Sequence, residues 1–166
     1  MGSHGTSRDK AEKILRTRRF TPSRNKGDWL GHGVYFWEHA PRQAPRWAEQ
    51  RYGKDNAIVV ASLIRLGNCL DLVDPENALA LHRYDLGLRE DALARGEELP
   101  GNHNAQKNLD CYVPQAFYAH IEALKEPRID SSRGVYVPTE GKAASDSDAP
   151  ESSSPVRGRR LWTRSW

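Results

Sequence analysis

Cysteine is scarce in this chain, which has only Cys69 and Cys111 among its 166 residues. Each lies inside an apolar segment, and two such residues cannot form the disulfide framework of a small secreted protein or a cysteine-rich zinc site. The scarcity favours a reducing compartment, so we expect a cytoplasmic protein.

Long apolar runs are also absent. The longest, Ala57–Ile64, is far shorter than the roughly 20 residues that a membrane-spanning helix needs. The N-terminus lacks the basic and then apolar stretch of a secretory signal. We therefore expect no partner in a membrane.

The remaining composition predicts one globular domain followed by a tail. Hydrophobic residues make up 37% of the chain and charged residues 28%, as in ordinary soluble domains. After Gly141 the chain becomes rich in Ser, Asp, Ala, Pro and Glu, and its last ten residues are rich in Arg and Trp. Such a stretch has too few apolar side chains to offset the entropy cost of ordering. We predict a domain at residues 1–141 and a disordered tail at 142–166 that adds no strand to the sheet.

Apolar periodicity and turn residues predict four helices and four strands within the domain. The helices are Ser7–Arg19, Pro41–Tyr52, Asp74–Ala94 and one that opens at Asn108 or Asp110, with Pro114 in its first turn. The strands are Val34–Trp37, Ala57–Ile64, Asn68–Leu72 and Arg133–Val137. The β-branched strand Ala57–Ile64 should be central and buried on both faces. Because strands and helices do not alternate regularly, the fold class is α+β.

Two short motifs flank the first predicted helix. One is His4-Gly5-Thr6-Ser7, and the other is Leu30-Gly31-His32-Gly33-Val34-Tyr35-Phe36, followed by a helix with small residues at Ala44 and Ala48. In this order the motifs resemble the ADP-ribosyltransferase superfamily, on its poly(ADP-ribose) polymerase-like, His-Tyr side. The resemblance implies a split antiparallel sheet flanked by helices, NAD as substrate, and a domain truncated at both ends.

The resemblance also implies roles for individual residues. His4 would orient the ribose of NAD, Gly5 would bind the nicotinamide carboxamide through its main chain, and the ring of Tyr35 would stack on nicotinamide. Thr6 and Gly33 would complete the binding site. We expect the imidazole of His4 and the phenol of Tyr35 to face each other across one cleft.

An acidic residue should complete the catalytic set, because loss of nicotinamide leaves positive charge on the ribose. Glu140 is the acidic residue nearest a late strand, but it follows that strand instead of opening one, which favours a loop carboxylate. Asp28 and His32 are candidates for the rim of the pocket or for loop positions. We expect no metal, since Cys111 and His120 have no complementary ligands in the sequence pattern.

Several functions remain open at this stage. The leading hypothesis is mono-ADP-ribosyl transfer from NAD to an acceptor that is a protein, a nucleic acid or a small molecule. Removal of a 2′-phosphate from RNA, within the same superfamily, would need a basic cradle near the pocket, whereas the arginines look scattered outside the tail. A non-catalytic NAD- or ADP-ribose-binding or interaction module is a third hypothesis, and nucleic-acid binding by the Arg/Trp-rich tail a fourth. The sequence does not indicate an oligomeric state.

Overall fold

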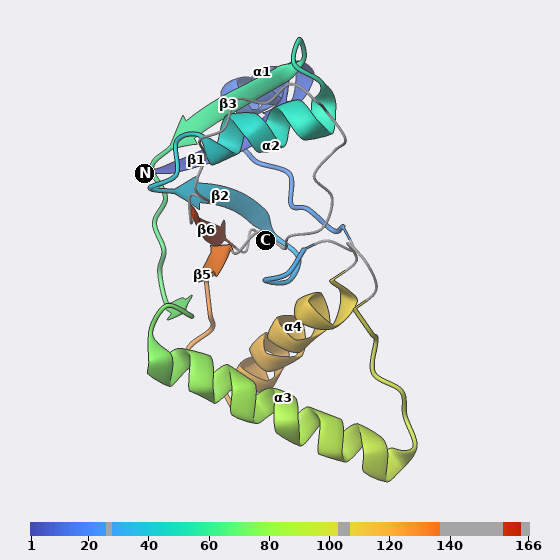
Figure 1. The fold of residues 1–166 in the computed structure, drawn as a ribbon. Coiled ribbons are helices and arrows are strands. Elements are labelled where there is room, and N and C mark those ends of the chain that lie inside the picture. The colour runs from blue at the N-terminus through green and yellow to red at the C-terminus, as the bar shows by residue number, and fades with distance from the viewer. Residues whose placement is uncertain (26–27, 103–106, 137–157, 164–166) are drawn as a thin grey trace.

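The structure is a computed structural model that describes residues 1–25, 28–102, 107–136 and 158–163 (Figure 1). Six strands form one sheet in the order β3-β1-β2-β6-β5-β4. The strands are β1 (Gly2–Ser7), β2 (Val34–Glu38), β3 (Ala57–Ser62), β4 (Cys69–Asp71), β5 (Ser131–Tyr136) and β6 (Gly158–Thr163). The helices are α1 (Arg8–Thr17), α2 (Gln43–Tyr52), α3 (Pro75–Arg95) and α4 (Asn108–Ala123). The described chain is α+β, as predicted.

The sheet opens between β1 and β2. All six residues of β1 pair with β3, but only Gly2 and Ser3 pair with β2. Strand β2 instead pairs along its whole length with β6. The sheet therefore has a narrow junction at the start of β1, beyond which the two strands diverge.

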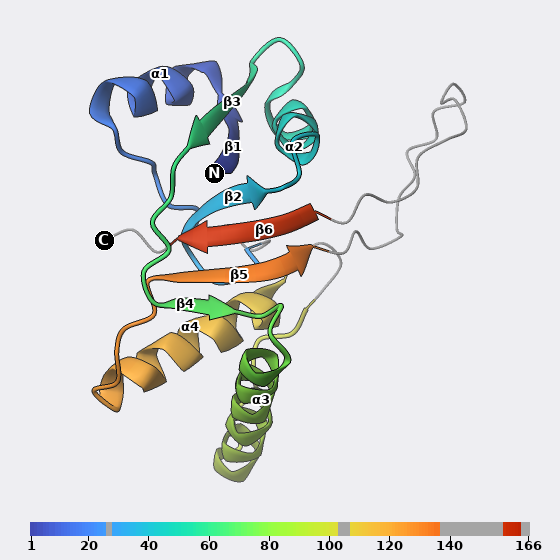
Figure 2. The same cartoon turned by 90° about the vertical axis from the view of Figure 1, so that its left-hand side faces the viewer.

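Neighbouring strands are antiparallel except at one edge, where β4 runs parallel to β5. The expectation of a purely antiparallel sheet is wrong at this edge. The reason lies in the connection, because α3 and α4 intervene between the two strands and return the chain to the same end of the sheet (Figure 2).

Helices cover the two halves of the sheet separately. Helices α1 and α2 lie on opposite sides of β1 and β3, while α3 and α4 lie at the β4 and β5 end (Figure 2). The largest core cluster joins α4 to that second half, and its buried members are Leu30, Leu70, Phe117, Tyr118 and Ile129. Burying such side chains stabilises the fold by roughly 1.5–3 kcal/mol each.

An ion-pair clamp crosses one face of the sheet. The Arg133 guanidinium lies 2.9 Å from a carboxylate oxygen of Glu38 and 2.9 Å from one of Asp71. These three residues stand on β5, β2 and β4, so the contacts span β6, which lies between β2 and β5. Strands β2, β5 and β4 are therefore linked by ion pairs between side chains, in addition to the main-chain pairing of the sheet.

Two local predictions are wrong. Strand β3 lies at an edge of the sheet and alternates half-buried with exposed residues, because only β1 pairs with it. Pro114 lies in the second turn of α4, where it has no N–H to donate to the preceding turn. At the helix starts, the Asp74 side chain caps α3 by accepting from the Glu76 amide, whereas Ser7 at the N-cap of α1 makes no side-chain capping hydrogen bond.

The prediction that the whole of 142–166 is a disordered tail is also wrong. Residues 158–163 form β6, which pairs with β2 on one side and β5 on the other. The composition argument failed because a strand between two others satisfies its main-chain groups on both sides, without needing an apolar run of its own. The other residues of the tail lie outside those that the structure describes.

Tyr118 offers a test of the core between α4 and the sheet. Its side chain is 2% exposed, and its hydroxyl lies 2.8 Å from Ser132 Oγ and 3.3 Å from the Leu30 carbonyl. We expect Tyr118→Phe to lower the free energy of unfolding by about 1–3 kcal/mol in urea titrations, because both partners lose a hydrogen bond inside the core. The half-exposed Tyr112 is the matched control, and an equal loss on Tyr112→Phe would contradict this account.

Candidate functional site

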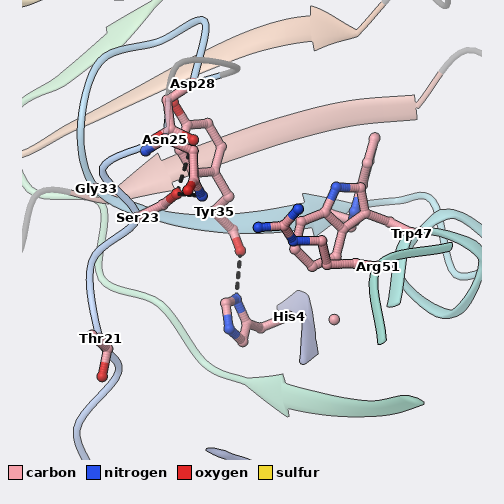
Figure 3. A pocket seen from close by; sticks show the side chains of 11 residues that line it. His4, Thr21, Ser23, Asn25, Asp28, Gly33, Tyr35, Trp47 and Arg51 are labelled. Atoms are coloured by element: carbon pink, nitrogen blue, oxygen red, sulfur yellow. Dashed lines mark hydrogen bonds between the residues drawn. The ribbon is translucent and has the colours of Figure 1, made fainter. Parts of the chain in front are cut away.

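A cavity of about 300 Å³ lies where β1 and β2 diverge (Figure 3). Its wall combines strand, helix and loop residues from the first third of the chain. They are His4, Gly5, Thr21, Ser23, Asn25, Asp28, Gly33, Tyr35, Trp37, Trp47 and Arg51. A second hollow of about 300 Å³ between α3 and α4 has a mainly apolar lining. The first cavity is the one that brings together residues of both sequence motifs, His4 and Gly5 with Gly33 and Tyr35.

The His4 imidazole forms part of the cavity wall. Its Nδ1 lies 2.8 Å from the main-chain oxygen of Tyr35 (Figure 3). Because a carbonyl oxygen only accepts, Nδ1 carries the proton and Nε2 is left as an acceptor. The ring also packs against Phe20 and Phe36, at centroid distances of 5.2 and 5.5 Å.

Burial controls the charge of this histidine. Loss of solvent lowers the pKa of His4 below its ordinary value of 6.5, and the nearby Lys10 ammonium acts in the same direction. The hydrogen bond to Tyr35 acts to raise the pKa but does not compensate. The imidazole is therefore neutral at pH 7, with a fixed tautomer.

Gly5 presents its main chain to the gap between the strands. In a strand, the N–H and C=O of successive residues point to opposite neighbours. The carbonyl of Tyr35 points toward β1, and so do the main-chain groups of Trp37, two residues further along β2. Trp37 pairs with Ser3, whose main-chain groups therefore point toward β2. Gly5 lies two residues after Ser3, so its N–H and C=O also point toward β2. Since the β1–β2 pairing ends at Ser3, these two groups face the cavity.

The lack of a side chain at Gly5 lets α2 approach β1 closely. A Cβ there would lie 2.6 Å from the Ala44 oxygen and 3.2 Å from both Ala48 Cβ and the Trp47 ring. Ala44 and Ala48 are themselves fully buried. The glycine is thus required for α2 to pack directly on β1, and this packing sets Trp47 beside the Gly5 main chain.

Tyr35 shapes the cavity through its main chain and its hydroxyl. The phenol donates to the Gly31 carbonyl and accepts from the Leu30 amide at 3.2 Å. These bonds tie the loop before β2 back onto the strand. His4 and Tyr35 do line one cavity, and the hydrogen bond between them joins the imidazole to the Tyr35 main-chain oxygen.

A hydrogen-bonded loop forms the polar wall opposite α2. Ser23 and Gly33 exchange main-chain hydrogen bonds of 2.7 and 3.1 Å. The buried Asp28 carboxylate accepts from Ser23 Oγ at 2.9 Å and from the Asn25 amide at 2.8 Å. Asp28 is the one carboxylate among the described residues that line the cavity.

The other predicted site residues have mixed outcomes. Gly33 lines the cavity, but Thr6 does not, since it is 1% exposed at the end of β1 where α1 begins. Glu140 lies outside the described residues. His32 is exposed on the loop and is not part of the cavity wall. Neither β5 nor β6 contains an Asp or Glu.

Sequence reasoning missed Trp47 and Arg51, which come from α2. Trp47 was interpreted as one member of an apolar helix stripe, and it does pack beside Trp37, Ala40 and Ala44. The signal that could have revealed both residues is their spacing of four, which places them on the same face of the helix. Ser23 and Asn25 were assigned only to a polar loop.

Within the described ranges, no group of three or more histidine, cysteine or acidic side chains is arranged to hold a metal ion. Nor does any helix in those ranges combine the length and apolar character that a bilayer crossing needs.

The protonation state of His4 is directly testable by nitrogen-detected NMR. We expect an Nδ1–H tautomer at pH 7.5 and a pKa below 6.5, because the folded environment disfavours the imidazolium. Protonation then occurs first in the unfolded chain, so this residue's contribution to stability is complete above about pH 6.5 and declines as the pH falls. A His4→Gln variant identifies the signals, and an Nε2–H tautomer or a charged ring at pH 7 would contradict the assignment.

Comparison with known proteins adds one partial similarity. A segment of 35 residues is 49% identical to part of an uncharacterized protein of Methanocaldococcus jannaschii, covering 21% of this chain and 16% of that protein. The chain thus spans a small fraction of the curated relative it matches. No family model matches the chain, and no solved structure does.

Proposed function

We propose that this protein binds NAD in the cavity between β1 and β2 and transfers its ADP-ribosyl group to an acceptor, releasing nicotinamide. The observation that carries the proposal is the pairing of a neutral His4, fixed by Tyr35, with the main-chain N–H and C=O of Gly5 in one cavity. This is the arrangement that the ADP-ribosyltransferase resemblance implies, and the opened sheet is compatible with the split sheet of that family.

The nicotinamide ring fits the inner part of the cavity. Its carboxamide offers one acceptor and one donor group, which match the N–H and C=O of Gly5. Trp47 lies next to Gly5, and Tyr35 lines the same cavity. An aromatic ring stacked there contributes about 1 kcal/mol beyond its buried area.

The ribose and the phosphates have partners further out. The unprotonated Nε2 of His4 can accept a hydrogen bond from a ribose hydroxyl. Arg51, at the cavity wall on α2, supplies a fixed positive charge for the pyrophosphate (Figure 3). A guanidinium is suited to this role because its planar donors match two phosphate oxygens at once.

The reaction begins when the glycosidic C–N bond breaks and its electron pair leaves with nicotinamide, which becomes neutral. The ribose carbon gains positive charge and is stabilised by a nearby carboxylate. The acceptor then bonds to this carbon and loses its proton to solvent. Asp28 is placed for the carboxylate role because it lines the cavity, whereas Glu140 remains a prediction from the sequence.

Binding and turnover of NAD test the proposal with a matched pair of variants. We expect Arg51→Gln to weaken NAD binding about tenfold in isothermal titration, because it removes a charged hydrogen bond to phosphate. Arg46→Gln, on the exposed side of the same helix, should leave the affinity within about twofold. Equal effects of the two changes would contradict a role for Arg51 in the site.

Nicotinamide release, followed by chromatography, separates the hypotheses. Binding with release supports the transferase, binding without release supports a non-catalytic module, and the absence of both overturns the NAD proposal.

The identity of the acid is tested by Asp28→Asn beside Glu140→Gln. We expect Asp28→Asn to slow nicotinamide release about 100-fold while NAD affinity changes less than about threefold, since the amide still accepts from Ser23. Glu140→Gln should release nicotinamide at the unmodified rate. The reverse pattern would assign the carboxylate role to Glu140 and leave Asp28 as a support for its loop.

A further inference from the structure

Charge is divided unevenly between the two ends of the molecule. Residues 1–65 contain thirteen Lys or Arg and six Asp or Glu, whereas residues 66–136 contain seven and twelve. The first group forms β1 to β3 with α1 and α2, and the second forms β4, α3, α4 and β5. In both ribbon views these groups lie at opposite ends (Figures 1 and 2). The net charge of +3 therefore conceals a basic end and an acidic end.

The basic end is also the end that contains the cavity. The lysines and arginines are not evenly spread over residues 1–136, because thirteen of the twenty precede Leu66. The exposed basic side chains of α1 and the segment after it are Arg8, Lys10, Lys13, Arg16, Arg18, Arg19 and Arg24. None of these seven forms an ion pair with a described residue. We call them, together with Arg51, the basic surface.

This surface reaches the mouth of the cavity at two points. Arg24 is exposed between Ser23 and Asn25, both of which line the cavity. On the other side, the Lys10 ammonium lies 3.4 Å from the Tyr52 hydroxyl and over its ring, and Tyr52 adjoins Arg51 in the chain. The seven cationic side chains thus outnumber the two exposed carboxylates of α1, Asp9 and Glu12, between the start of α1 and the residues that line the cavity.

We propose that the basic surface docks a nucleic-acid strand, which is the acceptor of the ADP-ribosyl group. This inference rests on the proposed function for its chemistry, although the docking itself is independent of NAD. A phosphodiester backbone is a regular line of charge, which the arginine-rich surface matches over several contacts. Tyr52, half-buried and next to Arg51 in the chain, offers an aromatic ring on which a base can stack.

The transfer step balances without a further reactant. The bond between the ribose carbon of NAD and the nicotinamide nitrogen breaks, and nicotinamide takes the electron pair. A nucleophilic oxygen or ring nitrogen of the nucleic acid forms the new bond to that carbon. Where this atom carried a proton, the proton goes to water.

The first test measures binding of the full chain to labelled single-stranded RNA, single-stranded DNA and duplex DNA by fluorescence anisotropy, without NAD. We expect at least one of them to bind, with an affinity that falls steeply as salt rises. Binding to none of the three overturns the proposal. So does binding that ignores salt, and so does binding only to vesicles of anionic phospholipid.

A matched pair of charge reversals locates the surface. We expect Arg16→Glu with Arg19→Glu to weaken binding at least about 20-fold at 0.1 M salt, because each lost phosphate contact on a single strand is worth roughly fivefold there. Arg83→Glu with Arg95→Glu makes the same charge change at the acidic end and should alter affinity less than about threefold. An equal loss in both variants overturns the assignment to the basic surface.

Nicotinamide release in the absence of nucleic acid keeps the two proposals apart. The Arg16 and Arg19 variant should release nicotinamide to water at the unmodified rate, because neither residue lines the cavity. With NAD and the bound strand together, ADP-ribose should appear on the strand by mass spectrometry. Strand binding without any nicotinamide release would refute the proposed function alone, while release without strand binding would refute this inference alone.

Discussion

The site depends on one hydrogen bond, from Nδ1 of His4 to the main-chain oxygen of Tyr35. It occupies the position where the next main-chain bond between β1 and β2 would form if the ladder continued past Ser3. The His4 side chain has replaced a main-chain N–H of β1 as the partner of the Tyr35 oxygen. The two strands therefore stay connected there, although their main-chain pairing has ended. The same bond fixes the tautomer of the imidazole, and burial keeps that ring neutral. The same hydrogen bond thus helps to form the cavity and determines which nitrogen of the histidine that lines it carries the proton.

The surrounding elements preserve this opening. On one side, α2 packs without any intervening side chain at Gly5, which prevents β1 from shifting toward the helix. On the other side, the Tyr35 hydroxyl and the Asp28 carboxylate each bind the loop that precedes β2. Because these supports lie on both sides of the gap, the cavity is preorganised in the absence of ligand, which reduces the entropy cost of binding one.

The sequence predicted those parts of the fold that depend on local patterns. Helices α1, α2 and α3 follow from apolar spacing and from breakers such as Gly53, and β2 from its compact apolar run. It did not predict neighbours in the sheet. Strand β3 is β-branched yet lies at an edge, and β6 is rich in arginine yet lies near the centre, because strand order depends on contacts between distant segments. For the site, motif residues such as His4 and Tyr35 were found, whereas Trp47 and Arg51 required knowledge of which face of α2 meets the cavity.

The order of the strands has a consequence for how the chain reaches its native state. Strand β6 is the last described strand along the chain, and it joins β2 to β5. Until β6 is synthesised, β2 and β5 lack this shared partner, and strand edges left open in this way invite pairing with other chains. Closing the sheet also brings together residues more than a hundred positions apart, a connectivity associated with slow folding. A chain assembled in this way is most exposed to aggregation in the interval between the synthesis of β5 and that of β6.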